Sequence, residues 1–328
     1  MSLESVNLRH KKSRMTSQTK GTICGIIAAV SYGTNPLGAL YLYQVGVNAD
    51  SVLFYRYTLA AVILMALMKV KKIPFAINIK ELSVIGGLGV LFAVSSLTLF
   101  TSFYFMDAGI ASTLLFVYPI MVAVIMAIFF HEKITFSTTL SILLALGGIA
   151  MLYKSDGNET LSTIGIILVM VSSLSYALYI IIINRSGLRM SAIKLTFYVL
   201  LFCILTIIVH SCMGQSYRLQ LLTTPYMWFF AFLLAVLPTV ISLVTMSIAV
   251  RIIGSTPTAI LGALEPLTAV AIGVTLFHEP FTPRLASGIL LILSGVILII
   301  LGKSIRPRNL RLILDHLRRL LQTALGKK

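Results

Sequence analysis

The chain repeats part of its own sequence at a constant separation of 147 positions, within long apolar stretches. Pro119 is followed twelve residues later by the pair His131-Glu132, and Pro266 is followed at the same spacing by His278-Glu279. Without any gap, the same separation relates three further pairs of identical residues: Ser95 and Ser242, Thr98 and Thr245, and Gly148 and Gly295. A duplication of this kind is typical of membrane proteins in which two like halves enclose a central site.

The composition excludes a soluble globular protein. Of the 328 residues, 58% are hydrophobic and 11% are charged, whereas soluble domains carry roughly a quarter charged residues. The cysteines Cys24, Cys203 and Cys212 are scattered through apolar stretches, so we expect no disulfide framework, no metal site and no cofactor. The first 20 residues are polar and basic, and no short apolar segment with a cleavage site follows them, so we expect no removable signal peptide.

Ten apolar runs are long enough, at about 18 to 25 residues, to cross a bilayer as helices. They lie near 21–43, 51–69, 83–106, 110–130, 136–153, 162–183, 192–212, 226–250, 256–278 and 283–302. Because each half holds five spans, an odd number, the second half must enter the membrane upside down relative to the first. The predicted fold is therefore all-α, a polytopic membrane protein of ten transmembrane helices in two inverted five-helix repeats, 21–153 and 162–302.

The basic residues indicate how these spans are oriented. If the amino terminus is cytoplasmic, 22 of the 26 lysines and arginines fall on the cytoplasmic side. Only Lys154, Arg218 and Arg284 fall outside, and Arg56 lies within a span. This bias matches the positive-inside rule, so both termini are predicted to be cytoplasmic in the inner (plasma) membrane. The net charge of +16 then reflects membrane orientation and does not indicate nucleic-acid binding.

Two polar segments flank the repeats. Residues 1–20 are predicted to form a basic cytoplasmic tail, and residues 303–328 a basic amphipathic helix. From Leu310 to Leu325, leucine and isoleucine recur at spacings of three and four, while arginines take the other positions. We expect this helix to lie on the anionic inner leaflet of the bilayer. Docking on a partner, or on the cytoplasmic face of the protein itself, is the alternative.

These features resemble those of the drug/metabolite transporter (DMT) superfamily, in its ten-span EamA branch, over residues 20 to 302. The resemblance rests on Arg56, on the stretch 111–119 with Glu132 after it, and on the second copy, which runs from Ala259 through Glu265-Pro266 and Glu279 to Gly288 and Gly295. It implies a ten-helix carrier with a central cavity and alternating access. Such carriers move amino acids or other small metabolites, often outward, and the resemblance does not transfer the identity of the substrate.

Glu265 is the acidic residue placed deepest in a predicted span. An ionised carboxylate at that depth costs about 2.5 to 3.5 kcal/mol, so something must offset the cost. Either Glu265 faces a water-filled cavity and binds a substrate or coupling ion, or it bonds the helix broken at the adjacent Pro266. Its repeat counterpart is Tyr118, beside Pro119, and we expect the two side chains to face one cavity.

Three other residues are candidates for the substrate site. Arg56 either extends to the membrane surface or grips a carboxylate or phosphate of the substrate through paired hydrogen bonds. Tyr32 and Asn35 lie in a cluster of polar residues, with Ser31 and Thr34, directly before Pro36. So many polar groups within about one turn suggest an opened helix that lines the transport path. Close packing of small residues between helices explains the serine and threonine equally well.

Two further groups occur in both repeats. Ser95 with Thr98, and Ser242 with Thr245, each share a helix face, and they are candidates to line the cavity, with helix packing as the default explanation. The pairs His131-Glu132 and His278-Glu279 lack the second histidine that a zinc-binding helix needs, so we expect them to cap helix ends or to gate the transport path.

The function these observations favour is a secondary carrier of small metabolites such as amino acids, with protons as the coupling ion through Glu265. A passive channel is the alternative, but it would need a continuous polar face through the bilayer. A membrane sensor or an intramembrane enzyme would need an output domain or a set of catalytic residues. We find neither in the sequence, so an enzyme is not expected. The expected partners are a small-molecule substrate and the lipid bilayer.

Overall fold

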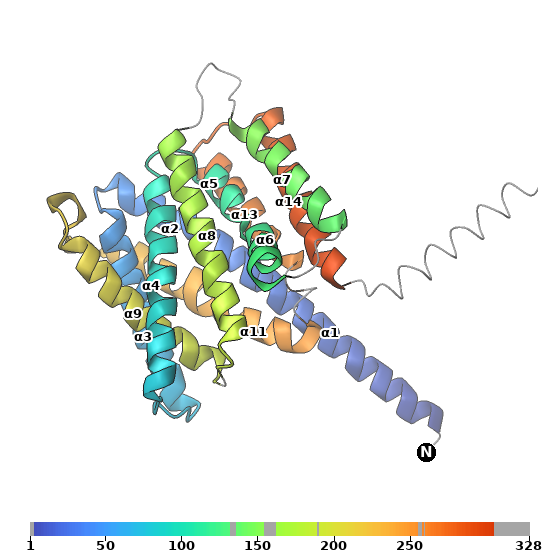
Figure 1. Cartoon of the computed structure of the whole chain (residues 1–328). Helices are drawn as coiled ribbons and strands as arrows, with labels where there is room; N and C mark the ends of the chain where they lie inside the picture. The colour runs from blue at the N-terminus through green and yellow to red at the C-terminus, as the bar shows by residue number, and fades with distance from the viewer. Residues whose placement is uncertain are drawn as a thin grey trace, which may run out of the picture.

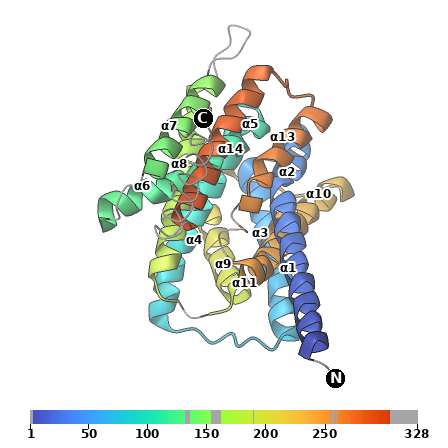
Figure 2. The same cartoon turned by 90° about the vertical axis from the view of Figure 1, so that its right-hand side faces the viewer.

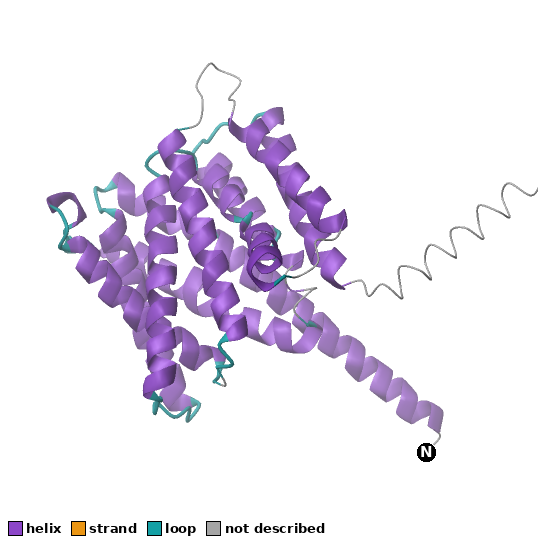
Figure 3. Ribbon diagram, viewed as in Figure 1, coloured by secondary structure: helices purple, strands orange, loops and turns teal. Residues whose placement is uncertain are grey.

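A computed structural model of the chain describes residues 3–131, 136–153, 162–188, 190–254, 258 and 260–304. Every element among these residues is helical (Figure 1, Figure 3). Seven segments are long and apolar enough to cross a membrane, and three shorter apolar helices lie at 136–152, 264–276 and 283–298. Together these ten segments match the ten predicted spans and confirm an all-helical membrane protein. The predicted amphipathic helix at the carboxyl terminus lies outside the described residues.

The first repeat forms five spans from seven helices. They are α1 (Leu3–Gly33) with α2 (Asn35–Gln44), α3 (Ala49–Val70), α4 (Ile79–Ser102), α5 (Ala108–Leu115) with α6 (Tyr118–Phe130), and α7 (Phe136–Tyr153). Helix α1 begins well before the membrane, so most of the predicted basic tail continues the first span as a helix. Side-chain caps fix several of these starts, because Asn48 accepts a hydrogen bond from the backbone of Ser51 and Asn78 forms a capping box with Glu81.

The second repeat follows the same plan. Its elements are α8 (Thr163–Arg185), α9 (Ala192–Ser211), the short 3-10 helix η1 (Gln215–Tyr217), α10 (Pro225–Ala235), the π-helix η2 (Val236–Ile241), α11 (Ser242–Ile253), α13 (Leu264–Leu276) and α14 (Pro283–Ser304). Helices α10, η2 and α11 together form one span, and η2 is a π-helical turn in its middle. Ser191 caps α9 and Thr224 caps α10 through their side-chain oxygens.

The helix contacts show that the two repeats are related by an approximate twofold axis. Equivalent helices pack on each other in the pairs α3 with α9 and α7 with α14. The broken fourth and ninth spans, which are also equivalent, meet through α5 and α13, and α4 packs on α8 as α11 packs on α1. Helix α1 runs upward in Figure 1 whereas its equivalent, α8, runs downward, and Figure 2 shows the same opposition from the side. The inverted repeat is therefore confirmed. Below, the lower end is the end of the bundle that carries the connection 71–78 in Figure 1.

Three spans are broken near their middles, each beside a proline. The first breaks at Thr34 before Pro36, the fourth at residues 116–117 before Pro119, and the ninth at residues 262–263 before Pro266. Proline lacks a backbone N–H and clashes with the preceding turn, so a helix is interrupted at such points. The breaks expose backbone polar groups at mid-membrane depth, where they must line a cavity or contact protein.

Candidate substrate site

The three helix breaks meet around one cavity. Its lining comes from both repeats: Tyr32, Gly33 and Asn35 from the first break; Ser112, Leu115, Phe116 and Tyr118 from the second; Glu265, Pro266 and Ala269 from the third; and Leu99 of α4 and Tyr176 of α8. The predicted site residues Glu265, Tyr118, Tyr32 and Asn35 are therefore brought together, although they lie far apart in the sequence.

Glu265 lies in the first turn of α13, where the positive end of the helix dipole stabilises a carboxylate. Its backbone N–H donates to the carbonyl of Gly262 (2.9 Å), while no described residue donates a hydrogen bond to its partly exposed carboxylate. Gly33 allows the first span to approach the backbone of α13 closely, because a Cβ atom at Gly33 would lie 2.6 Å from the carbonyl oxygen of Glu265. A carboxylate left free in a cavity can accept a hydrogen bond from a ligand.

Asn35 supplies a second free acceptor in the cavity. Its side chain is 5% exposed, and Nδ2 donates to the carbonyl of Tyr32 (2.8 Å). Oδ1 is buried and has no hydrogen-bond partner within the described part of the chain. Buried polar atoms are almost always paired in folded proteins, so an unpaired acceptor that faces a cavity indicates a place for a donor on a ligand or a water molecule.

Aromatic rings form the rest of the polar lining. The rings of Tyr118 and Tyr176 meet edge to face with centroids 4.7 Å apart, and Tyr176 stacks on Tyr179 at 5.8 Å. Tyr176 was missed by the sequence analysis. A signal existed, because Ser175-Tyr176 in the first span of the second repeat corresponds to Ser31-Tyr32 in the first span of the first repeat, at an offset of 144.

Arg56 lies inside the bundle and is not among the residues that line the cavity. It is 3% exposed, its Nε donates to Oγ1 of Thr239 (2.9 Å), and its guanidinium lies over the rings of Tyr57 (5.2 Å) and Phe100 (5.6 Å). No carboxylate of a described residue lies within ion-pair distance of it. Tyr32, which lines the cavity, lies close enough to Arg56 and to Glu265 to interact electrostatically with both.

The four hydroxyl residues shared by the repeats lie away from the cavity. Ser95 contacts Ser172 (Oγ to Oγ, 3.1 Å), which joins α4 to α8. Thr98 and Thr245 donate to carbonyls of their own helices, and Ser242 is buried. Thr239, which receives the Arg56 hydrogen bond, was not foreseen because no sequence pattern marks the π-helical turn that holds it.

His131, His278 and Glu279 lie at or just after helix ends. His131 and His278 occupy equivalent positions and share a left-handed backbone, with φ of 53° and 55°. Glu279 accepts hydrogen bonds from the backbone N–H groups of Ala108 (2.8 Å) and Gly109 (3.2 Å), so it joins the second repeat to the start of α5. Burial raises the pKa of the Glu279 carboxyl above its usual value, even though these two hydrogen bonds lower it. Glu132 lies outside the described residues.

Comparison with known proteins agrees with this architecture. The family model for EamA-like transporters matches residues 19–154 and 163–301, once for each repeat. The chain belongs to the EamA-like transporter family. It is therefore a multi-pass membrane transporter of the DMT superfamily, and this family is one of transporters, not of enzymes.

Two curated relatives of this EamA transporter are also named as transporters. An uncharacterized transporter of Bacillus subtilis, YvbV, is 24% identical over 220 residues, covering 64% of this chain and 71% of that protein. An uncharacterized transporter of Archaeoglobus fulgidus is 26% identical over 200 residues, covering 58% and 67%. One solved crystal structure matches with a TM-score of 0.62 and 15% identity, covering 85% of this chain and 96% of that one, which supports the fold alone.

Proposed function

We propose that this EamA transporter is an alternating-access carrier of small zwitterionic metabolites such as amino acids, that it exports them across the plasma membrane, and that it exchanges them for protons at Glu265. The observation that carries the proposal is the free carboxylate of Glu265 in a cavity where both repeats meet. A site at the repeat interface near mid-membrane is where rocking of one repeat against the other gives access from alternate sides.

The groups around the cavity match the two ends of a zwitterion. The Glu265 carboxylate and Asn35 Oδ1 accept hydrogen bonds from an ammonium group. Arg56 does not line the cavity, but it interacts electrostatically with the lining residue Tyr32. Its Nε–H is used for Thr239, and its terminal N–H groups are the proposed partners of a substrate carboxylate. Apolar side chains such as Leu115 and Phe116 then surround the remainder of the substrate.

Competition for Glu265 would couple transport to protons. A substrate ammonium group favours the charged carboxylate, whereas a proton neutralises it, so one site binds either ligand but not both. Binding the two ligands in turn from opposite sides gives antiport. In this proposal the lower end of the bundle and both termini are cytoplasmic, as the distribution of lysine and arginine indicates.

A passive channel is the alternative function. The polar residues of the described site gather around one cavity near the middle of the bundle, which favours a carrier. The two can be separated with purified protein. A thermal-shift screen against metabolites identifies ligands, because a ligand of the folded state raises the melting temperature. Uptake of a labelled ligand into proteoliposomes should then be accelerated by unlabelled ligand inside. Uptake that is unaffected or slowed by internal ligand would contradict a carrier.

A further inference from the structure

A second pocket lies at the lower end of the bundle, between α3, α9 and α11. Its lining includes Lys71 at the end of α3, Arg251 in the last turn of α11, and Ser191 with Ala192 at the start of α9. The pocket thus combines two cations from different repeats with the amino-terminal end of a 20-residue helix. All three features favour a negatively charged ligand.

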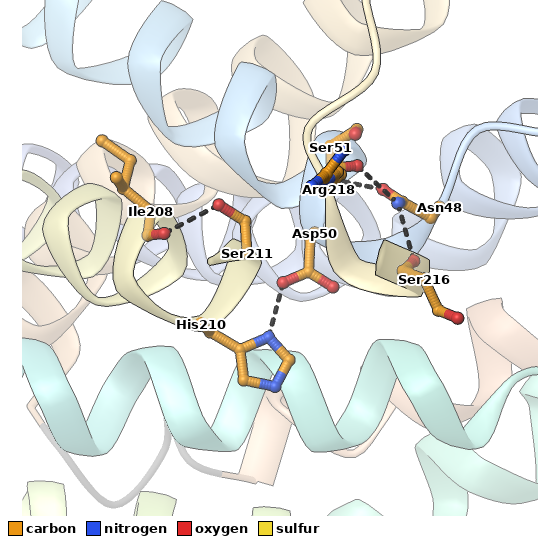
Figure 4. A network of polar contacts seen from close by, with 8 residues as sticks. All are labelled: Asn48, Asp50, Ser51, Ile208, His210, Ser211, Ser216 and Arg218. Atoms are coloured by element: carbon orange, nitrogen blue, oxygen red, sulfur yellow. Dashed lines mark hydrogen bonds and ion pairs between the residues drawn. The ribbon is translucent and has the colours of Figure 1, made fainter. Parts of the chain in front are cut away.

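At the upper end, the start of the equivalent helix α3 carries a carboxylate of the chain itself. There, Asp50 near the start of α3 contacts His210 near the end of α9 (Oδ1 to Nδ1, 2.6 Å), and Figure 4 shows this pair beside the Asn48 cap. Asn48 also donates to the carbonyls of Ser216 (3.1 Å) and Arg218 (2.9 Å). At that end, a carboxylate of the chain provides the negative charge beside the helix start, and Asp50 is only 5% exposed.

Among the described residues, none supplies such a carboxylate to the lower pocket. Helices α3 and α9 are equivalent, their caps are Asn48 and Ser191, and the second helical residue after the cap is Asp50 in α3 but Ile193 in α9. Ile193 lines the lower pocket, and no acidic side chain does. Neither Lys71 nor Arg251 has an ion-pair partner in the part of the chain that the structure describes. The two ends related by the approximate twofold axis therefore differ. The upper end carries the carboxylate of Asp50, whereas the lower pocket has two cations and no described carboxylate.

We propose that the lower pocket binds a phosphate group, with Lys71 and Arg251 as its charged ligands and Ser191 as a hydroxyl donor. Arginine and lysine both bind phosphate oxygens well, and the start of α9 adds backbone N–H groups. The phosphate can come from a lipid headgroup or from a free phosphate ion. Both cations lie at the ends of apolar spans, where headgroups are expected, and the apolar side chains of Val244 and Ile248 also line the pocket, next to which lipid carbon chains could lie.

The test compares the two sources with purified full-length protein. Thermal unfolding is measured in nanodiscs of phosphatidylcholine with increasing phosphatidylglycerol, and separately in neutral detergent with increasing inorganic phosphate. The melting temperature should rise with phosphatidylglycerol, with inorganic phosphate or with both, and the arm that responds identifies the source. Removing both cations in K71A/R251A should weaken the apparent affinity by about 25-fold, at about fivefold for each cation. The matched control K69A/K80A removes two exposed lysines that do not line the pocket, and it should behave like wild type.

A second variant does not depend on removing charge from the surface. Ile193→Asp gives α9 the carboxylate that α3 has at Asp50, so the chain should neutralise its own pocket. We expect this variant to be as stable as wild type in pure phosphatidylcholine and to lose the response to phosphate or to phosphatidylglycerol. The proposal is overturned if neither arm stabilises the wild type. It is also overturned if K71A/R251A and K69A/K80A respond equally, or if Ile193→Asp keeps the full response.

Discussion

Arg56 of the first repeat and Thr239 of the second are joined by a buried hydrogen bond of 2.9 Å. Thr239 in turn donates to the carbonyl of Leu234, five residues earlier, within the π-helical turn of the eighth span. π-Helical turns are rare in proteins, and those that do occur often lie at functional sites. The Arg56 contact therefore ties a buried cation of the first repeat to a π-helical turn of the second.

Arg56→Lys should separate the roles of charge and shape. Lysine keeps the positive charge but loses the planar group that donates to Thr239 and lies over Tyr57 and Phe100. We expect substrate affinity to fall by about 1 to 3 kcal/mol, measured by titration of the purified protein. Thr239→Val is the matched control, since it keeps the guanidinium but leaves its buried Nε–H unpaired, at about 1 to 3 kcal/mol of stability. Equal substrate affinity in wild type, Arg56→Lys and Arg56→Gln would limit Arg56 to a structural role.

Glu279 should make stability depend on pH. Its folded-state pKa is raised by burial, so folding favours the protonated form. This contribution to stability is complete below the unfolded-state value, about 4.3, and is lost as pH rises through the higher folded-state pKa. Glu279→Gln, which stays neutral, should flatten the plot of melting temperature against pH over that window. A slope identical to that of wild type would show that Glu279 does not titrate in it.

Gly273→Ala should disturb the same contact by steric means. A Cβ atom at Gly273 would lie 2.0 Å from Oε2 of Glu279, so the carboxylate must leave the start of α5. We expect a loss of about 1 to 3 kcal/mol in the free energy of unfolding. Gly87→Ala is the matched control, because nothing lies within 4 Å of its Cβ position and alanine favours a helix. A Gly273→Ala protein as stable as the Gly87→Ala protein would contradict the described contact.

The orientation of the membrane domain can be tested by chemical labelling. Single cysteines at Lys72 and Gln215, in a protein without the three native cysteines, should react with an impermeant thiol reagent from opposite sides. Gln215 is exposed at the upper end and should react in intact cells, whereas Lys72 should react only after the membrane is opened. Labelling of both positions in intact cells would contradict the proposed topology.

The fold could be predicted from the sequence because the fold depends on features that are visible in a linear pattern of residues. Apolar length sets the spans, the odd number of spans sets the inversion, and Pro36, Pro119 and Pro266 mark the breaks. Four of the five predicted substrate residues meet at one cavity for the same reason, since they lie beside the breaks.

The remaining parts of the site depend on how helix faces pack, which the pattern does not fix. Ser95 was a candidate for the cavity, but it faces α8 and contacts Ser172. Arg56 was expected either to reach the surface or to grip the substrate, and its hydrogen bond to Thr239 depends on a π-helical turn without a sequence signature. Small rotations of a helix about its axis decide which polar residue faces a cavity and which faces a neighbour.

The carboxylate of Glu265 is central to the proposed transport mechanism, and one substitution tests it directly. Transport of a confirmed ligand is measured in proteoliposomes across a series of pH values for wild type, Glu265→Gln and Glu81→Gln, a matched control that removes a charge at a helix cap far along the chain. We expect Glu265→Gln to fold, to lose the pH dependence of transport and to lose accumulation driven by a proton gradient, while Glu81→Gln keeps both. Unchanged uptake with an unchanged pH profile in Glu265→Gln would contradict the mechanism and assign Glu265 to stabilising the broken helix at Pro266.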